Sequence, residues 1–241
     1  IALSQSGETI DVIDAVKRAR EKEAKIYALV NALGSTLYRM ADYKILLMAG
    51  PEKAVASTKA FTAKLAHLII LAYAVAGRLP EGKKYLSQAI EAMESILKNE
   101  IPTIKKIAKK IVNSHHVFAI GRGLAYPIAL EAALKIKEIS YIHAEGLPSG
   151  ELKHGTIALV EKGTPCIAFL PNDETYGANL VGAMEMKARG GYIIGISHTP
   201  HEVFDYYIPV SDCREASIIP QTMVVQLLAY FLAVEKGLDP D

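Results

Sequence analysis

Two hydrophobic patterns alternate along the 241-residue chain. Short, unbroken apolar runs are typical of strands buried on both faces of a parallel sheet, and the segments between them repeat apolar residues at helical spacing. This alternation predicts an α/β fold in which helices cover parallel sheets. The expected strands cover residues 1–3, 26–30, 43–48, 117–120, 165–170, 192–196 and 206–210, and the expected helices cover residues 9–22, 56–76, 85–98, 103–112, 125–140, 176–189 and 219–236.

The second half of the chain repeats the order of elements found in the first. Glu8-Thr9, a helix and the apolar run 25–31 align with Glu174-Thr175, a helix and the run 192–198. The separation of aligned positions stays at about 157 to 167 residues, which indicates a duplication. We therefore expect two duplicated, doubly wound parallel-sheet domains, each with three layers in the order α/β/α.

The repeat also predicts where the domains lie. We expect the first domain in residues 1–80, a helical connector in residues 81–100 and the second domain in residues 101–241. The second domain opens with a strand at 117–120 that has no counterpart in the first. Because a domain that began in mid-sheet would expose an apolar edge, we expect the first domain to be incomplete at its N-terminus.

Composition narrows the possible partners. With 27 basic and 26 acidic residues, the net charge of +1 provides no general attraction to nucleic acid or to an anionic membrane, and we expect neither partner. The most apolar stretches, 65–77 and 223–234, are too short to span a bilayer and predict buried helices. Cys166 and Cys213 form no disulfide framework, which is typical of a reducing cytoplasm, where we place the protein.

The turn Ser4-Gln5-Ser6-Gly7-Glu8-Thr9 lies between the first expected strand and the first expected helix. Glycine permits a tight turn, the first amides of the helix are open to an anion, and the hydroxyl and amide side chains add donors. Ser6 alone could serve as an ordinary helix cap. One cap explains a single polar residue, whereas a row of them favours a phosphate site.

A second candidate site lies on the expected helix 125–140. Glu131, Lys135 and Glu138 have spacings of four and three residues, which place them on one helical face. Such a triplet is ordinarily a solvated face with ion pairs. This helix is otherwise rich in Ala, Leu and Ile, so we expect it to be largely buried, where a carboxylate beside a lysine can transfer protons.

Histidine chemistry is expected shortly after this helix. His143 and Glu145, followed by Glu151 and His154, could suggest a metal, but no two-histidine helical spacing or CxxC pair supports one, and we expect no metal. His154 is either a polar loop residue or a proton shuttle, because imidazole titrates near neutrality. The sequence Gly121-Arg122-Gly123 lacks the third glycine of a dinucleotide fingerprint, and we expect no cofactor.

A loop at 50–59 opens the long apolar helix of the first domain. Ser57 and Thr58 are suited to cap this helix while presenting hydroxyl groups. The loop becomes part of a site only if it faces the turn 4–9, as we expect if the two preceding strands are sheet neighbours.

Four segments together resemble the isomerase region of the glucosamine-6-phosphate synthase family, also called glutamine:fructose-6-phosphate aminotransferases. This region is built from two sugar-isomerase (SIS) domains, and the resemblance covers essentially the whole chain. The first segment alone occurs in many sugar-phosphate isomerase domains, whereas the four in this order are specific. They are SQSGET at 4–9, ASTKAFT at 56–62, EAALKIKEISYIHAE at 131–145 and GELKHG at 150–155.

The resemblance implies roles for individual residues. Ser4, Gln5, Ser6 and Thr9 would bind the phosphate of fructose 6-phosphate, the substrate, or of glucosamine 6-phosphate, the product. Val55 and Ser57 would lie close to the sugar. Catalysis would use Glu138 to move the proton between C1 and C2, Lys135 to assist, and His154 to open the sugar ring. In this family the histidine comes from the neighbouring subunit, which implies a homodimer.

The chain also departs from the family pattern. The glutaminase domain, a partner of this region in the full-length protein, is absent, as are one phosphate-binding serine and the C-terminal lysine that forms a Schiff base. Two alternatives therefore stay open: a glucosamine-6-phosphate deaminase of the SIS type, and a sugar-phosphate sensor without catalysis. The sensor would require the phosphate turn but not Glu138 or His154.

Overall fold

The computed structural model describes residues 1–240, which form two compact units. Unit 1 is Ile1–Ala76 and unit 2 begins at Gly77. Every strand pair in both units is parallel, which confirms the expected α/β class. Nearly all of the expected connector, residues 81–99, lies in one helix, α4 (Leu79–Asn99), which belongs to unit 2.

Unit 1 is built on a three-stranded sheet with the order β1-β2-β3. The two faces of β2 have different neighbours: Ala28 and Val30 pack in a cluster with α1 and α2, whereas Leu29 packs against Ala60 of α3. The sheet is therefore covered by helices on both faces. The elements of unit 1 are β1 (Ala2–Ser4), α1 (Ile10–Glu21), β2 (Tyr27–Val30), α2 (Thr36–Met40), β3 (Tyr43–Leu46) and α3 (Lys59–Val75).

Unit 2 contains a five-stranded sheet with the order β5-β4-β6-β7-β8. Its elements are α4 (Leu79–Asn99), α5 (Ile101–Ile111), β4 (His116–Gly121), α6 (Ala125–Ser140), β5 (His143–Pro148), the 3₁₀ helices η1 (Ser149–His154) and η2 (Thr156–Leu159), β6 (Pro165–Leu170), α7 (Tyr176–Ala188), β7 (Tyr192–Ser197), β8 (Tyr206–Pro209), η3 (Arg214–Ser217) and α8 (Ile218–Glu235).

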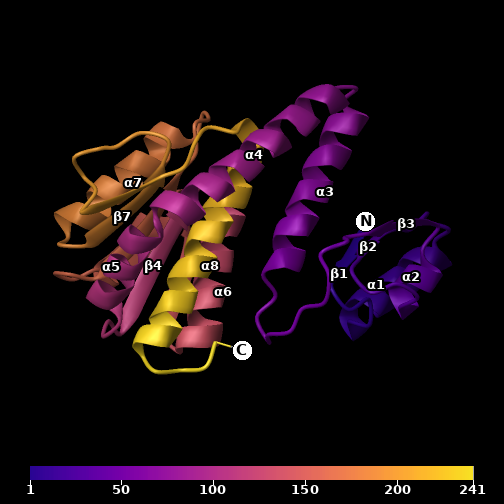
Figure 1. The fold of residues 1–241 in the computed structure, drawn as a ribbon, viewed down its shortest axis with the longest axis horizontal. Coiled ribbons are helices and arrows are strands. Elements are labelled where there is room, and N and C mark those ends of the chain that lie inside the picture. The colour runs from indigo at the N-terminus through magenta and orange to yellow at the C-terminus, as the bar shows by residue number, and fades with distance from the viewer. Residues whose placement is uncertain (241) are drawn as a thin grey trace. The chain divides into compact units, whose positions relative to one another are not determined.

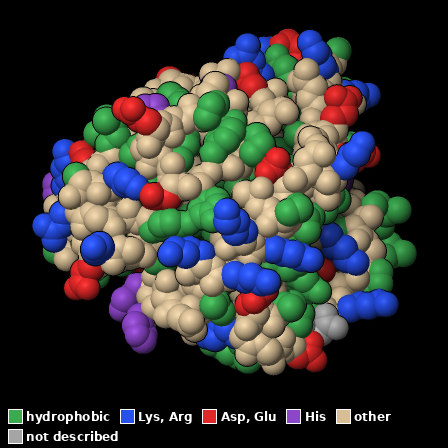
Figure 2. Space-filling view, turned by 60° about the vertical axis from the view of Figure 1, so that its left-hand side comes forward, with side chains coloured by type: hydrophobic (Ala, Val, Ile, Leu, Met, Phe, Trp, Pro, Cys, Tyr) green, Lys and Arg blue, Asp and Glu red, His purple; other side chains and the backbone are tan. Residues whose placement is uncertain are grey.

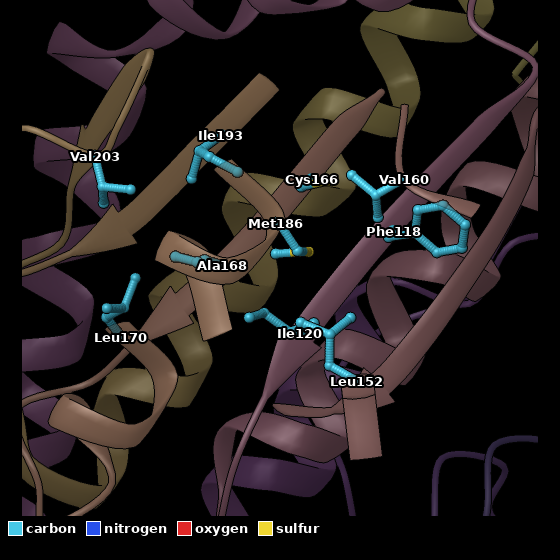
Figure 3. Close-up of a cluster of buried hydrophobic side chains, with 11 residues drawn as sticks. Phe118, Ile120, Leu152, Val160, Cys166, Ala168, Leu170, Met186, Ile193 and Val203 are labelled. Carbon is cyan, nitrogen blue, oxygen red and sulfur yellow. The ribbon is translucent and has the colours of Figure 1, made fainter. Parts of the chain in front are cut away.

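The two faces of the unit 2 sheet are also covered. Figure 3 shows one face, where Phe118 and Ile120 of β4 and Cys166 of β6 pack with Met186 of α7. On the other face, α6 packs on β4 and β5, and α8 lies beside α6 (Figure 1). These contacts give the expected order of layers, with α7 on one side and α6 and α8 on the other.

The same hydrogen bond, from a backbone amide to an aspartate side chain, occurs in both units and supports the duplication. In unit 1 the amide of Ile26 donates to Asp42 (2.8 Å), and in unit 2 the amide of Ile193 donates to Asp205 (2.7 Å). Ile26 and Ile193 are aligned positions of the sequence repeat. In each case the aspartate directly precedes one strand, β3 or β8. Its hydrogen bond links the start of that strand to the start of the neighbouring strand, β2 or β7.

The most apolar helix is a core element. The span Arg214–Glu235 is long and apolar enough to cross a membrane, although its most apolar stretch, 223–234, is too short alone. However, 72% of its apolar window is buried inside the protein. It packs against α6, α5 and α4 of the same unit, as expected for a buried core helix.

Several boundaries differ from the expected ones. Helix α4 starts at Leu79 rather than at residue 85, because Pro80 occupies its first turn, where proline is well tolerated. Strand β5 and the short helix α2 were not expected. The sequence of β5, HAEGLP, contains glycine, proline and charged residues and so lacks the apolar run by which the other strands are recognised.

Gly146 of β5 allows the backbone of α6 to lie directly on the sheet. A Cβ atom at this position would be 2.5 Å from the carbonyl oxygen of Ala129 and 2.6 Å from its carbonyl carbon. Both atoms belong to the backbone of α6, so no flexible side chain could move away. The position of α6, and of the charged side chains that it carries, therefore depends on this glycine.

We predict that Gly146→Ala lowers the free energy of unfolding by about 1–3 kcal/mol, because the added methyl group forces α6 away from β5. Gly177→Ala in α7 is the matched control, because a Cβ there meets no atom within 4 Å. The control should leave stability unchanged or raise it by up to about 1 kcal/mol, since alanine favours helix. Urea unfolding measures both variants, and equal midpoints would contradict the close α6–β5 contact.

Candidate functional site

The turn at 4–9 follows the carboxyl end of β1 and is fixed from within by Ser4. The side chain of Ser4 is buried; its hydroxyl accepts the amide of Gly7 (2.9 Å) and lies 3.0 Å from the hydroxyl of Thr9. Gly7 has a φ of +69°, and a Cβ atom there would lie 2.0 Å from the hydroxyl oxygen of Ser35. Glycine is thus required both by the backbone conformation and by the neighbouring loop.

The outer part of the turn presents donors beside the start of α1. Thr9 is the N-cap residue, but no side chain caps the helix, so the amides of the first turn keep the positive end of the helix dipole open. Ser6 is exposed and accepts the amide of Glu8 (3.1 Å). The simple capping role considered for Ser6 is therefore wrong. Gln5 is half-buried beside it.

Asn31 connects the three loops at this edge of the unit 1 sheet. Its backbone N–H donates to the carbonyl of Gln5 (3.1 Å). Its side-chain oxygen accepts the backbone N–H of Ala49 (3.1 Å), and its side-chain nitrogen donates to the carbonyl of Gly50 (2.6 Å). Sequence reasoning missed this residue, because its partners lie far away along the chain. A polar residue directly after an apolar strand was the available signal.

A second connection runs from the turn to α2. The carboxylate of Glu8 accepts the amide of Thr36 at the start of α2 (2.7 Å), and this backbone hydrogen bond holds the pKa of Glu8 below its usual value. The contact fixes the neighbouring Ser35, whose buried hydroxyl has no hydrogen-bond partner in the described part of the chain. Ser35 was not among the expected site residues.

The loop before α3 is arranged differently from the expectation. Strands β1 and β3 are not neighbours, because β2 lies between them. Thr58 makes no side-chain cap; instead, the carboxylate of Glu52 accepts the amides of Thr58 (3.2 Å) and Ala60 (2.9 Å) and the hydroxyl of Ser57 (3.3 Å). Val55 is 89% exposed at the tip of this loop.

In unit 2, the charged triplet of α6 forms one connected group. The ammonium group of Lys135 lies 2.5 Å from a carboxylate oxygen of Glu138 and 3.7 Å from one of Glu131. The side chains of Lys135 and Glu131 are 3% and 7% exposed, whereas that of Glu138 is 32% exposed. The solvated surface face considered as an alternative is therefore wrong, and Glu138 is the member that a ligand from solvent can reach.

His154 ends the 3₁₀ helix η1, which follows β5 at the carboxyl edge of the unit 2 sheet. Its side chain is exposed, while Leu152 in the same segment is fully buried and anchors it. Lys153 forms an ion pair with Glu185 of α7 (2.7 Å). Within residues 1–240, no hydrogen bond or ion pair joins His154 to Glu138.

The unit 2 counterpart of the turn at 4–9 has different chemistry. Asp173 occupies the position that aligns with Gly7, and its carboxylate accepts both the amide (2.8 Å) and the hydroxyl (2.6 Å) of Thr175. In unit 1, the aligned Thr9 is near only a neutral serine hydroxyl. The Asp173 carboxylate thus takes up donors of this turn, and its charge disfavours an anion there.

Charged side chains on the rest of the described surface are of both signs. Acidic and basic side chains are interspersed on the face shown in Figure 2. Across residues 1–240, no group of three or more His, Cys, Asp and Glu side chains could surround a metal ion.

Comparison with known proteins shows the family of the chain. The family model described as "SIS domain" matches residues 1–74 and 110–230. The chain belongs to the SIS domain family. The two matched segments contain the turn at 4–9 and the group on α6, so both candidate sites lie within the SIS-matched parts of the chain.

Individual SIS proteins extend the comparison. Proteins named glutamine–fructose-6-phosphate aminotransferase [isomerizing] are 42% identical in Caldanaerobacter subterraneus and 41% identical in Pyrococcus horikoshii, over the whole chain. The chain spans only 42% and 41% of their lengths. A solved C-terminal domain of glucosamine-fructose-6-phosphate aminotransferase from Francisella tularensis is 35% identical with a TM-score of 0.88, and the match covers 99% of this chain and 72% of that one.

Proposed function

We propose that this chain is the isomerase part of an enzyme that converts fructose 6-phosphate and ammonia into glucosamine 6-phosphate and water. The observation that carries the proposal is the turn at 4–9, whose hydroxyl groups lie beside uncapped helix amides, together with an ion pair in unit 2 between the buried Lys135 and the solvent-accessible Glu138. The names of the relatives at 41–42% identity support the same substrate and product.

The phosphate group is bound by the turn in unit 1. Ser4 shapes the turn from inside, while Gln5, Ser6 and Thr9 offer donors together with the first amides of α1. Phosphate is favoured there because the helix dipole and several hydrogen bonds act on the same anion. Val55 and Ser57 contact the sugar from the loop that Glu52 holds in place.

Proton transfer is carried out by the group on α6. Glu138 takes a proton from C1 and returns it to C2, which converts a ketose into an aldose without a redox change. Lys135 keeps Glu138 in position and balances the charge that develops on the substrate oxygen or nitrogen. A sensor would need the phosphate turn but not this ion pair, so the pair favours an enzyme.

His154 opens the sugar ring before isomerisation. Its exposed position at the end of η1 suits a side chain that serves a neighbouring subunit, and we propose a homodimer in which it does so. Imidazole is suited to this step because it both accepts and donates a proton near neutral pH. The residues of the chain supply all these groups, and the proposal needs no cofactor or metal.

Ammonia comes, in this proposal, from a glutaminase domain in the full-length protein.

We place the enzyme in the cytoplasm. Both cysteines are free and buried, and burial raises the pKa of the Cys166 thiol to about 12 and that of Cys213 to about 11. Thiols in this state are inert, as suits packing residues in a reducing compartment.

We predict that Ser6→Ala weakens binding of glucosamine 6-phosphate by about 10- to 100-fold, because a hydrogen bond to a charged group contributes about 1.5–3 kcal/mol. Calorimetric titration measures the affinity. Ser87→Ala, a change at an exposed serine of α4, is the control and should bind as the unchanged chain does. Unphosphorylated glucosamine should bind both proteins weakly and equally. Unchanged affinity of Ser6→Ala for the phosphosugar would remove the phosphate assignment.

A further inference from the structure

Two histidines lie side by side at the amino ends of β4 and β5. His116 and His143 are register partners in the parallel strand pair, so their side chains project from the same face of the sheet. Their Nδ1 atoms are 3.0 Å apart, and the ring centroids are separated by 5.1 Å with the rings nearly perpendicular. Both residues are exposed.

This spacing is close to that of two ligands on one metal ion. Imidazole nitrogens bind Zn²⁺ at about 2.0–2.1 Å, and tetrahedral angles then place two such nitrogens about 3.3 Å apart. The two Nδ1 atoms would have to move apart by only a few tenths of an ångström, which exposed side chains achieve with small rotations. The backbone positions are held by the sheet, because β4 lies between β5 and β6. The two donors are therefore brought together before any ion binds.

We propose that His116 and His143 chelate one divalent transition-metal ion of the Zn²⁺, Ni²⁺ and Cu²⁺ group. Neutral imidazole favours these ions over Mg²⁺ and Ca²⁺, which prefer oxygen ligands. Because no group of three or more potential ligands surrounds a metal anywhere in residues 1–240, water completes the coordination shell. The ion would bind reversibly, at a surface site, rather than as part of the core.

The site is independent of the proposed enzymatic activity. His116 and His143 begin their strands, whereas Ser149–His154 follows the opposite, carboxyl end of β5. The charged group of α6 also contains neither histidine. A failure of metal binding would therefore leave the phosphosugar proposal untouched, and the reverse also holds.

His115 provides a matched control. It precedes His116 in the chain and is also exposed, but its ring centroid is 6.5 Å from that of His116, farther than the His143 ring. No hydrogen bond is formed between His115 and the pair in the described chain. If surface histidines bound the ion without a defined geometry, His115 would contribute as much as the others.

The test is calorimetric titration of the whole chain, without an affinity tag, with ZnCl₂ and separately with NiCl₂. We expect one ion per chain, with affinity lowered about 10-fold or more in each of His116→Ala and His143→Ala, because each change removes one of two protein ligands. His115→Ala should change the affinity less than about twofold, and excess MgCl₂ should not compete.

Three results would overturn the proposal. Wild-type protein that binds no ion would show that the short contact is only a hydrogen bond between two rings. Equal affinity in His116→Ala and the wild type would place the ion elsewhere, and an equal loss in His115→Ala would indicate nonspecific binding to surface histidines. Circular dichroism of each variant checks that the fold is retained, as expected for changes at exposed positions.

Discussion

Parallel strand pairing places the carboxyl ends of all strands at one edge of each sheet, and the candidate site depends on this constraint. In unit 1, it brings Gln5, Asn31 and Gly50 together, although they follow three different strands. In unit 2, it places η1 directly after β5 at the corresponding edge. Because loops that follow parallel strands share an edge, residues distant in sequence can act on one ligand.

The duplicated halves have kept their framework while their turns have diverged. The aspartate contacts of Asp42 and Asp205 preserve the strand arrangement in both units. In contrast, Gly7 in one turn aligns with Asp173 in the other, where a carboxylate takes the donors of Thr175. This difference is the reason why we propose an anion site in unit 1 and not in the corresponding turn of unit 2.

Local patterns were sufficient to predict most elements, and α6 begins and ends at the expected residues. The burial of much of α6 was also expected, because this helix is rich in Ala, Leu and Ile, whereas the spacing of its charged residues alone left a solvated face open. Strand β5 was missed, since Gly146 and Pro148 remove the apolar run that marks a strand. The cap by Glu52 and the link through Asn31 could not be found locally, because each depends on how the backbone folds back on itself.

The central claim is that Glu138 moves the proton between C1 and C2 of a bound phosphosugar. The most direct measurement uses the full-length protein and fructose 6-phosphate that carries tritium at C1, and follows loss of the label from C1, counting both label found at C2 of the product and label found in water. In Glu138→Gln, this loss should slow by about 10²- to 10⁴-fold, the usual contribution of a general base, while the affinity for the phosphosugar changes less than about twofold. Loss of the label from C1 at the wild-type rate in Glu138→Gln would contradict the account.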